Sequence, residues 1–222
     1  MKTKNQHIID LFNQRFTCKK YDKDKIVSKE DFETIIEVAR LSPSSFGYEP
    51  WKFILLNNQK IKDQIRPYSW GGHAALDGAS HFVLILARTA PDMQPDSKYI
   101  EHIHNNVQNY PKDMVAGRQK RYGDFLDKDF KINESARSVF DWTSKQAYIP
   151  LTSMMLTAAA LGIASTPIEG FNQDEVHKIL VSNGVYDPNH FKVAVMGSFG
   201  YGEPAKRFKM RQTLNEVFTE IN

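Results

Sequence analysis

Three stretches of the sequence place cationic side chains or hydroxyls where they could bind a ligand, and Pro43–Ser45 could line a small-molecule pocket. Arg15, Thr17 and Lys19 alternate along an extended segment, so a period of two places them on one side. The run Lys206–Arg211 concentrates cations near the carboxyl terminus, and Pro43–Ser45 carries hydroxyls in a turn-rich loop. Arginine forks and lysine point charges both bind phosphate oxygens. Each stretch also has a plain structural explanation: a solvated edge strand, a solvated basic tail and an ordinary loop.

Motifs for several other chemistries are missing or wrongly spaced. The glycines of Met196–Gly202 follow a predicted strand, but they do not form G-x-G-x-x-G, so a dinucleotide-binding Rossmann site is not indicated. His102 and His104 are two positions apart on a predicted helix and would point to different faces, which disfavours a metal site. Cys18 has no histidine near it in the sequence, which favours a buried side chain over a nucleophile. We find no G-x-S-x-G, H-E-x-x-H or P-loop motif.

One long helix is predicted to position these groups. It runs from Asn133, the expected N-cap, to a stop at Gly162. Between Phe140 and Leu161 its apolar residues fall on nearly every face. A helix that is apolar all round has to be buried all round. We therefore expect it at the centre of a core or of a subunit interface.

The segment after this helix could bind a ligand through its backbone. Ile163–Thr166 is predicted to form a short strand, and Pro167 ends regular pairing because it lacks an N–H group. Glu169 and Gly170 can then turn backbone amides towards a ligand, since glycine tolerates a close approach.

The other elements predict one α/β or α+β layered domain over residues 1–222. The apolar run Phe82–Ala87 is typical of a central strand that is covered on both faces. A charged excursion spans about residues 118–131, and a tail from about residue 200 to 222 is expected to wrap a partner subunit. The remaining predicted helices are at 6–14, 28–41, 61–65, 97–122 and 173–180, and the remaining strands at 51–56 and 191–196.

The composition limits the class of protein. With 222 residues, 41% hydrophobic and 12% aromatic, the chain can bury a core, and its net charge of +3 is too small to argue for nucleic acid. The single cysteine excludes an intrachain disulfide and fits a reducing compartment. The first residues lack the apolar segment of a secretory signal, and no apolar run is long enough to span a membrane. We expect a cytoplasmic protein that binds neither nucleic acid nor membrane.

Taken together, the motifs resemble those of the FMN-dependent nitroreductase family, which also holds flavin reductases and dihydropteridine-reductase-like enzymes. Arg15–Tyr21 resembles the family's R-x-[S/T]-x-[K/R]-x-[F/Y] opening. Ser42–Ser45 followed by Pro50–Phe53 resembles its S-P-S-S loop and P-W-x-F strand. Further matches, in the family's order, are Ala79–His81, Lys145–Tyr148, Pro167–Phe171 and Lys209–Arg211.

This resemblance implies FMN as the cofactor and NADH or NADPH as the electron donor. Arg15, Lys209 and Arg211 would bind the FMN phosphate, and Lys19 would lie at the pyrimidine edge, where a cation favours the reduced anionic flavin. No metal is implied. The full set of expected FMN contacts is Arg15, Phe16, Thr17, Lys19, Pro43, Ser44, Ser45, Gln146, Pro167, Ile168, Glu169, Gly170, Lys209 and Arg211.

The implied reaction is ping-pong hydride transfer through flavin N5, which the backbone amide of Glu169 or Gly170 would reach. Nitroaromatics, quinones or related acceptors would take the place that NAD(P)H leaves, and no catalytic side chain is required. The expected substrate-pocket residues are Phe46, Tyr122 and Phe125.

The implied fold is a three-layer α+β nitroreductase fold with a central mixed β-sheet. The long helix would form the core of a homodimer with active sites at the interface, to which Ser44 and Ser45 would come from the second subunit. Where many relatives carry an asparagine after Trp70, this sequence has Gly71-Gly72-His73.

Two rival functions remain open from the sequence. A flavin reductase would supply reduced flavin to another enzyme, and turnover with free FMN against a nitrofuran separates it from a nitroreductase. A non-enzymatic binding protein would use the basic tail 206–211 on an acidic partner, without bound flavin and with binding that weakens steeply with salt.

Overall fold

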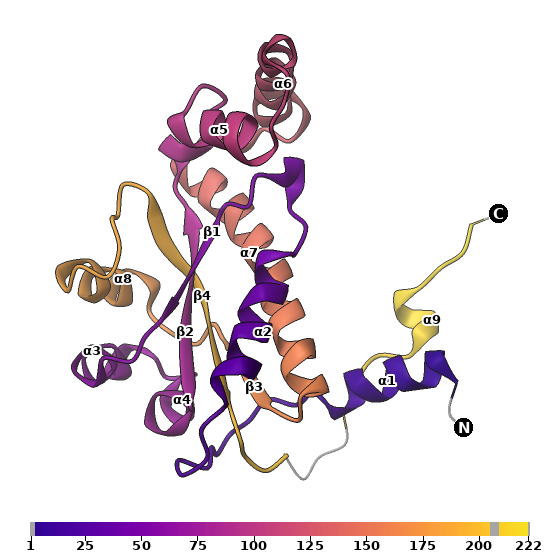
Figure 1. Cartoon of the computed structure of the whole chain (residues 1–222), viewed down its shortest axis with the longest axis vertical. Helices are drawn as coiled ribbons and strands as arrows, with labels where there is room; N and C mark the ends of the chain where they lie inside the picture. The colour runs from indigo at the N-terminus through magenta and orange to yellow at the C-terminus, as the bar shows by residue number, and fades with distance from the viewer. Residues whose placement is uncertain (1–2, 205–208, 222) are drawn as a thin grey trace.

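The computed structural model describes residues 3–204 and 209–221 and shows an α+β fold (Figure 1). Four strands form the sheet in the order β1-β2-β4-β3. Their bounds are Trp51–Leu55 for β1, His81–Arg88 for β2, Ala164–Ile168 for β3 and Phe191–Gly200 for β4.

The pairing of these strands corrects the expectation of a mixed sheet. Every pair of named strands in the described residues is antiparallel. The parallel pairing found there is an isolated bridge between Thr17 and Ser165. The segment 15–21 makes only this bridge and a second one between Tyr21 and Gly202, with a bend at residues 19–20 between them. It therefore lies against β3 without adding a parallel strand.

The central strand β2 confirms the three-layer prediction. Its residues 82–87 are fully buried, and because side chains of a strand alternate between faces they enter two different cores. One core takes Phe82, Leu84 and Leu86, and the other takes Val83, Ile85 and Ala87. The first core is covered by α3 (Gln59–Ile65), α4 (His73–Gly78) and α8 (Gln173–Ser182), and the second by α2 (Lys29–Arg40) and α7 (Ala136–Ala160) (Figure 1).

The long helix α7 begins later than predicted. Its N-cap is Ser135, whose hydroxyl accepts a hydrogen bond from the Ser138 amide at 3.0 Å, whereas Asn133 lies in the preceding 3-10 turn. A serine in extended conformation is a good N-cap and sits directly before the helix. The predicted stop is confirmed, because Gly162 follows the last turn with a φ of +72°. Within one protomer α7 is not buried all round, since Ile149 is 37% exposed.

A helical end covers the region of the predicted excursion 118–131. It contains α5 (Lys98–His102), α6 (Lys112–Asp124) and π-helical turns after each of them. Tyr122 and Leu126 are fully buried there and belong to a third core that also contains Trp142 of α7. The excursion is therefore packed helical structure and not an open arm.

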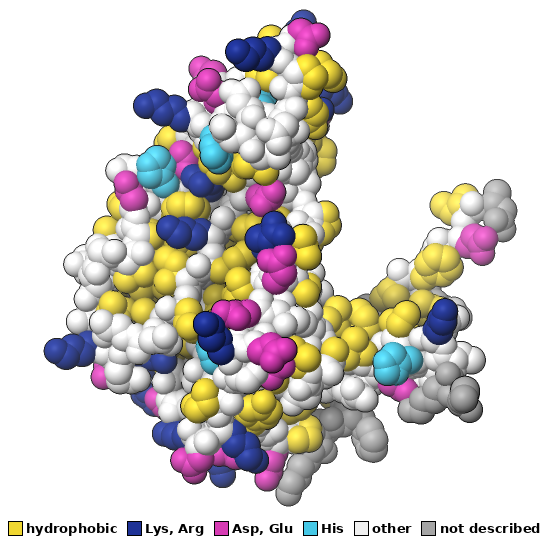
Figure 2. All heavy atoms as spheres, viewed as in Figure 1, with side chains coloured by type: hydrophobic (Ala, Val, Ile, Leu, Met, Phe, Trp, Pro, Cys, Tyr) yellow, Lys and Arg dark blue, Asp and Glu magenta, His cyan; other side chains and the backbone are white. Residues whose placement is uncertain are grey.

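The two ends of the chain form an arm beside the body (Figure 1). Helix α1 (Lys4–Gln14) contributes no buried residue, and the short α9 (Leu214–Val217) lies in the tail. Figure 2 shows hydrophobic side chains along this arm. The exposed apolar residues of the two ends are Ile8, Ile9, Phe12, Met210, Leu214, Val217, Phe218 and Ile221. Such a surface is typical of a protein interface. None of the helices in the described ranges has the length and hydropathy needed to cross a bilayer.

Candidate functional site

Three cations from the two ends of the chain lie within reach of one another. The Lys209 ammonium donates hydrogen bonds to the backbone oxygens of Phe12 and Arg15, the latter at 2.7 Å. Burial and the neighbouring Arg211 lower the pKa of Arg15. Burial, Arg15 and Arg211 lower the pKa of Lys209. We call Arg15, Lys209 and Arg211 the cation cluster. In the described part of the chain none of the three pairs with a carboxylate.

The segment that carries Arg15 is attached to β3 by polar contacts. The Thr166 hydroxyl donates to the Cys18 backbone oxygen at 2.9 Å. The Tyr21 hydroxyl lies 3.0 Å from the Thr166 hydroxyl and 2.9 Å from that of Ser198, and burial raises the pKa of Tyr21 to about 12. Cys18 is buried, as predicted. The backbone of Ser165 forms the β-bridge to Thr17. The buried hydroxyl of Ser165 has no hydrogen-bond partner among the described residues, so the site retains an unused polar group.

The predicted alternation of Arg15, Thr17 and Lys19 is only partly right. Arg15 and Thr17 are half-buried, but Lys19 is exposed together with Lys20, because the bend at these two residues breaks the period of two. The Lys19 side chain therefore extends into solvent beside the site.

The end of β3 approaches the loop after Trp70 very closely. The Gly71 amide donates to the Gly170 oxygen at 2.7 Å. A Cβ atom on Gly170 would lie 2.8 Å from the Gly71 Cα atom, so both positions require glycine. This contact explains the glycine at position 71 of this chain. The neighbouring Ile168 side chain is buried in the core, so only its backbone is available to a ligand.

Tyr148 of α7 contacts the segment that follows β3, and it was not predicted as a site residue. Its hydroxyl donates to the Glu169 carboxylate at 2.6 Å. Burial, the hydrogen bond to Glu169 and its charge all raise the pKa of Tyr148. The motif Lys145–Tyr148 contained this residue, but its role depends on a neighbour 21 residues away in the chain.

The predicted residues of loop 43–49 contact α7 at a different place. The Ser45 amide donates to the Gln146 side-chain oxygen at 2.8 Å, and the Ser44 hydroxyl accepts from the Glu49 amide at 2.8 Å. Two positions along an α-helix correspond to a rotation of about 200°. Gln146 and Tyr148 therefore point to opposite sides of α7. One protomer consequently separates the predicted FMN contacts into two groups, one at Ser44–Gln146 and one at the β3 end.

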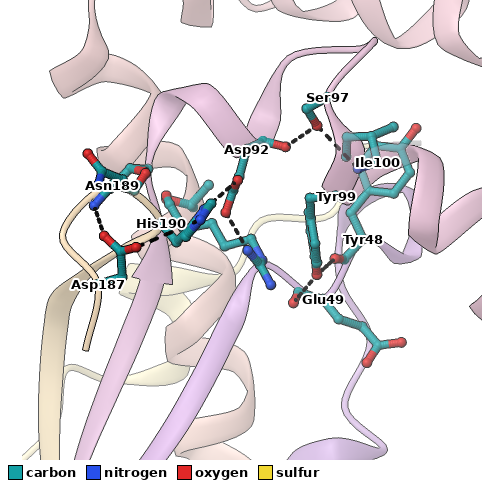
Figure 3. Close-up of polar contacts among 12 residues, drawn as sticks. Tyr48, Glu49, Asp92, Ser97, Tyr99, Ile100, Asp187, Asn189 and His190 are labelled. Atoms are coloured by element: carbon teal, nitrogen blue, oxygen red, sulfur yellow. Dashed lines mark hydrogen bonds and ion pairs between the residues drawn. The ribbon is translucent and has the colours of Figure 1, made fainter. Parts of the chain in front are cut away.

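A buried polar network supports loop 43–49 from behind (Figure 3). The Tyr99 hydroxyl donates to the backbone oxygens of Tyr48 at 2.6 Å and Glu49 at 2.9 Å. The Arg88 guanidinium lies 3.4 Å from the centroid of the Tyr99 ring and pairs with Asp92. The loop needs such support, because Phe46 and Glu49 have φ angles of 58° and 46°, which are unfavourable for side-chain-bearing residues.

The structure brings the three predicted substrate-pocket residues together and corrects the role of one. The Phe46 ring centroid lies 5.1 Å from that of Tyr122 and 5.0 Å from that of Phe125. Tyr122 is fully buried and donates to the Met93 backbone oxygen at 2.9 Å, so it has no surface for a ligand. Phe46 and Phe125 are half-buried and keep exposed surface.

A hollow of about 950 Å³ adjoins the cation cluster through Arg15. Arg15 and Phe16 are the predicted site residues on its wall, and Ala159, Gly162 and Tyr201 line it as well. The remaining predicted contacts lie outside it. The tail residues 206–208, which we expected to extend the cluster, lie outside the described residues.

Comparison with known proteins identifies the family of this chain. The model of the nitroreductase family matches residues 13–201. A Staphylococcus saprophyticus protein named "Putative NAD(P)H nitroreductase SSP0379" is 44% identical over 212 residues, which cover 96% of this chain and 95% of that protein. "Putative NAD(P)H nitroreductase YfkO" of Bacillus subtilis is 43% identical over 210 residues, 95% of each chain.

The chain belongs to the nitroreductase family.

Solved structures confirm the nitroreductase fold. A nitroreductase-like protein of Streptococcus mutans has a TM-score of 0.79 at 17% identity, over 99% of this chain and 100% of that one. A protein of Exiguobacterium sibiricum described as "a putative nitroreductase in complex with FMN" has a TM-score of 0.72 at 19% identity, over 100% of this chain and 99% of that one.

As a member of this family the protein is an oxidoreductase. This finding overturns the alternative of a binding protein without enzyme activity, which rested on the basic tail alone.

Proposed function

We propose that this nitroreductase-family protein is an FMN-dependent NAD(P)H oxidoreductase that reduces nitroaromatics, quinones or related acceptors. The observation that carries the proposal is the cation cluster, whose members have no carboxylate partner in residues 3–204 and 209–221. Cations that lower one another's pKa lie in an unfavourable arrangement unless an anion compensates them. The dianionic phosphate of FMN fits the cluster in charge and in its need for hydrogen-bond donors.

The residues around the cluster extend the fit to the rest of FMN. Thr17 and the unpartnered Ser165 hydroxyl supply further polar groups beside Arg15. The exposed Lys19 is free to place its charge at the pyrimidine edge. At the β3 end Glu169 is exposed, whereas Gly170 is buried against Gly71 and Trp70, so Glu169 is the more accessible of the two proposed N5 contacts. When bound, FMN would supply the redox chemistry of ping-pong hydride transfer between NADH or NADPH and the acceptor.

The separation of the predicted contacts supports a homodimeric active site. Ser45 and Gln146 lie on one side of α7, and Glu169 lies on the other beside Tyr148. A second copy of the chain would bring its Ser44, Ser45 and Gln146 to the β3 end of the first. The exposed apolar arm of α1 and the tail supplies surface for such a contact.

A flavin reductase remains the second candidate, and we place either enzyme in the cytoplasm. The single cysteine is buried and reduced, which fits a reducing compartment. A Staphylococcus epidermidis protein described as "a putative NAD(P)H:FMN oxidoreductase" shares this fold at a TM-score of 0.70, which is a reason to test free flavin as an acceptor. Turnover with free FMN is compared with turnover of a nitrofuran to separate the two.

The visible absorption spectrum of the purified protein tests the proposal. We expect the bands of oxidised flavin, release of FMN on denaturation, and bleaching by NADH or NADPH under anaerobic conditions. The nicotinamide nucleotide that bleaches the flavin faster is the preferred electron donor. A protein that stays colourless after incubation with FMN contradicts the proposal.

A further inference from the structure

A smaller hollow of about 320 Å³ lies between α6 and loop 43–49. Its size is at the lower end for small-molecule sites and suits a single aromatic ring with one substituent. The ring of Phe46 forms one wall, and α6 forms the other. The residues that line it are Phe46, Asp113, Met114, Gly117, Arg118 and Arg121.

Arg118 is the uncompensated charge of this hollow. Its guanidinium lies 3.9 Å from the centroid of the Tyr110 ring, and its buried Nε atom has no hydrogen-bond partner among residues 3–204 and 209–221. It forms no ion pair within the described residues, whereas Arg121 on the same wall pairs with Asp129 at 3.2 Å. The charge of Arg118 reaches the buried His104 and lowers its pKa, after the larger effect of burial. An anion is the partner that Arg118 lacks.

The loop that faces Arg118 is held in a strained form. Phe46 has a φ of 58°, and its backbone oxygen and that of Gly47 accept hydrogen bonds from the Gln108 side chain at 2.9 and 3.0 Å. Residues in this conformation persist where their surroundings hold them, and they concentrate at functional sites. Here the strained conformation turns the Phe46 ring against Tyr122 and Phe125 and keeps it on the wall of the hollow.

The hollow adjoins the proposed FMN contacts. Phe46 directly follows Ser45, whose amide binds Gln146. A ring stacked near Phe46 is therefore one residue along the loop from Ser45, a proposed FMN contact, and Arg118 lines the same hollow.

We propose that this hollow receives the electron acceptor, and that Arg118 selects acceptors that carry a carboxylate on an aromatic ring. The inference rests on the proposed function and adds the acceptor class. Arg118 binds the carboxylate, and Phe46 and Met114 contact the ring. Arg121 on the same wall is paired with Asp129, which leaves Arg118 as the residue that decides selectivity.

Acceptor selectivity tests this proposal. The reaction is ArNO₂ + NAD(P)H + H⁺ → ArNO + NAD(P)⁺ + H₂O, with hydride from NAD(P)H and the proton from solvent. We compare kcat/KM for 4-nitrobenzoate with that for the neutral isostere 4-nitrobenzamide. The native protein prefers the benzoate, and Arg118→Gln lowers the benzoate-to-benzamide ratio about tenfold, mainly through the KM of the benzoate. The matched control Arg137→Gln removes an exposed arginine that pairs with Asp141 on α7, and it leaves the ratio unchanged.

Binding gives the same comparison without turnover. Benzoate and benzamide are titrated against the visible spectrum of the flavin-loaded protein, and we expect Arg118→Gln to weaken benzoate binding about tenfold relative to benzamide binding. Far-UV circular dichroism and flavin content establish that each variant is folded and loaded. If the benzoate-to-benzamide ratio is the same in the native protein and in Arg118→Gln, the proposed carboxylate selectivity is wrong, while the proposed function stands. A protein that does not retain flavin overturns the proposed function instead.

Discussion

The cation cluster and loop 43–49 meet the same proposed ligand, yet they are built in opposite ways. Arg15, Lys209 and Arg211 come from the exposed ends of the chain, and few contacts hold them. Loop 43–49 is braced by Tyr99, which Arg88 and Asp92 support in turn (Figure 3). The first region gathers like charges that need an anion, and the second is rigid before any ligand binds. In this proposal the cation cluster supplies most of the binding energy for FMN, and loop 43–49 supplies a geometry that is already fixed before FMN binds.

Charge reversal in the cation cluster tests the first half of this comparison and has the largest expected effect. Lys209→Glu with Arg211→Glu replaces two charge-assisted contacts by repulsion, so FMN affinity falls by about two to four orders of magnitude. Flavin content after gel filtration measures the loss. The matched control is Lys128→Glu with Arg137→Glu, which reverses two exposed cations, one in the π-helical turn after α6 and one on α7, and retains flavin. Full flavin content in the Lys209/Arg211 variant would refute the phosphate assignment.

High pH tests the burial of two tyrosines: Tyr21, which lies against β3 near the cation cluster, and Tyr48 of loop 43–49. Burial raises the pKa of both Tyr21 and Tyr48 to about 12. Above pH 10 the unfolded chain releases these protons while the folded chain holds them, so the free energy of unfolding falls as pH rises towards 12. Tyr21 alone accounts for about 2–3 kcal/mol of this loss. Urea unfolding at pH 8 and pH 11.5 measures it, and Tyr21→Phe shows a smaller fall than the native protein. An equal fall in the two proteins would contradict the burial of this hydroxyl.

The contact between Gly71 and Gly170 tests how tightly the β3 end is packed. Gly170→Ala forces a methyl group to within 2.8 Å of backbone, which destabilises the fold by about 1–3 kcal/mol. The control Gly117→Ala places a methyl group in open space inside α6 and stabilises the helix by about 0.5–1 kcal/mol. Thermal unfolding compares the two variants, and opposite shifts in Tm are expected. If both shifts had the same sign, the close approach would be disproved.

Removing the hydrogen bonds that support loop 43–49 has the smallest expected effect on stability and activity. Tyr99→Phe removes the donor to the Tyr48 and Glu49 oxygens and costs about 1 kcal/mol of stability, with a rise in the KM of the acceptor and no loss of flavin. The control is Tyr68→Phe, a residue that is 40% exposed. A loss of flavin equal to that of the charge-reversed variant would show that the two regions do not act separately.

Much of the fold could be predicted because local patterns encode it. The continuous apolar run of β2 and the all-round apolar pattern of α7 identify the sheet and the helix that covers it, and Gly162 marks the end of that helix. The order of short motifs identified the family, which the family model confirms. The antiparallel pairing was missed, because pairing direction depends on how distant segments meet and not on the pattern within any one strand.

The amino-acid sequence determined the element types, the cationic, hydroxyl and glycine residues of the candidate site, and the family. The tertiary structure decided which of those residues meet. It joined Lys209 to Arg15, Tyr148 to Glu169 and Gly71 to Gly170 across long separations in the chain. It also buried Tyr122 and left Arg118 without a carboxylate partner in the described residues. The physical reason is that periodicity reports how one segment meets solvent and core, whereas contacts between distant segments arise only when the whole core is packed.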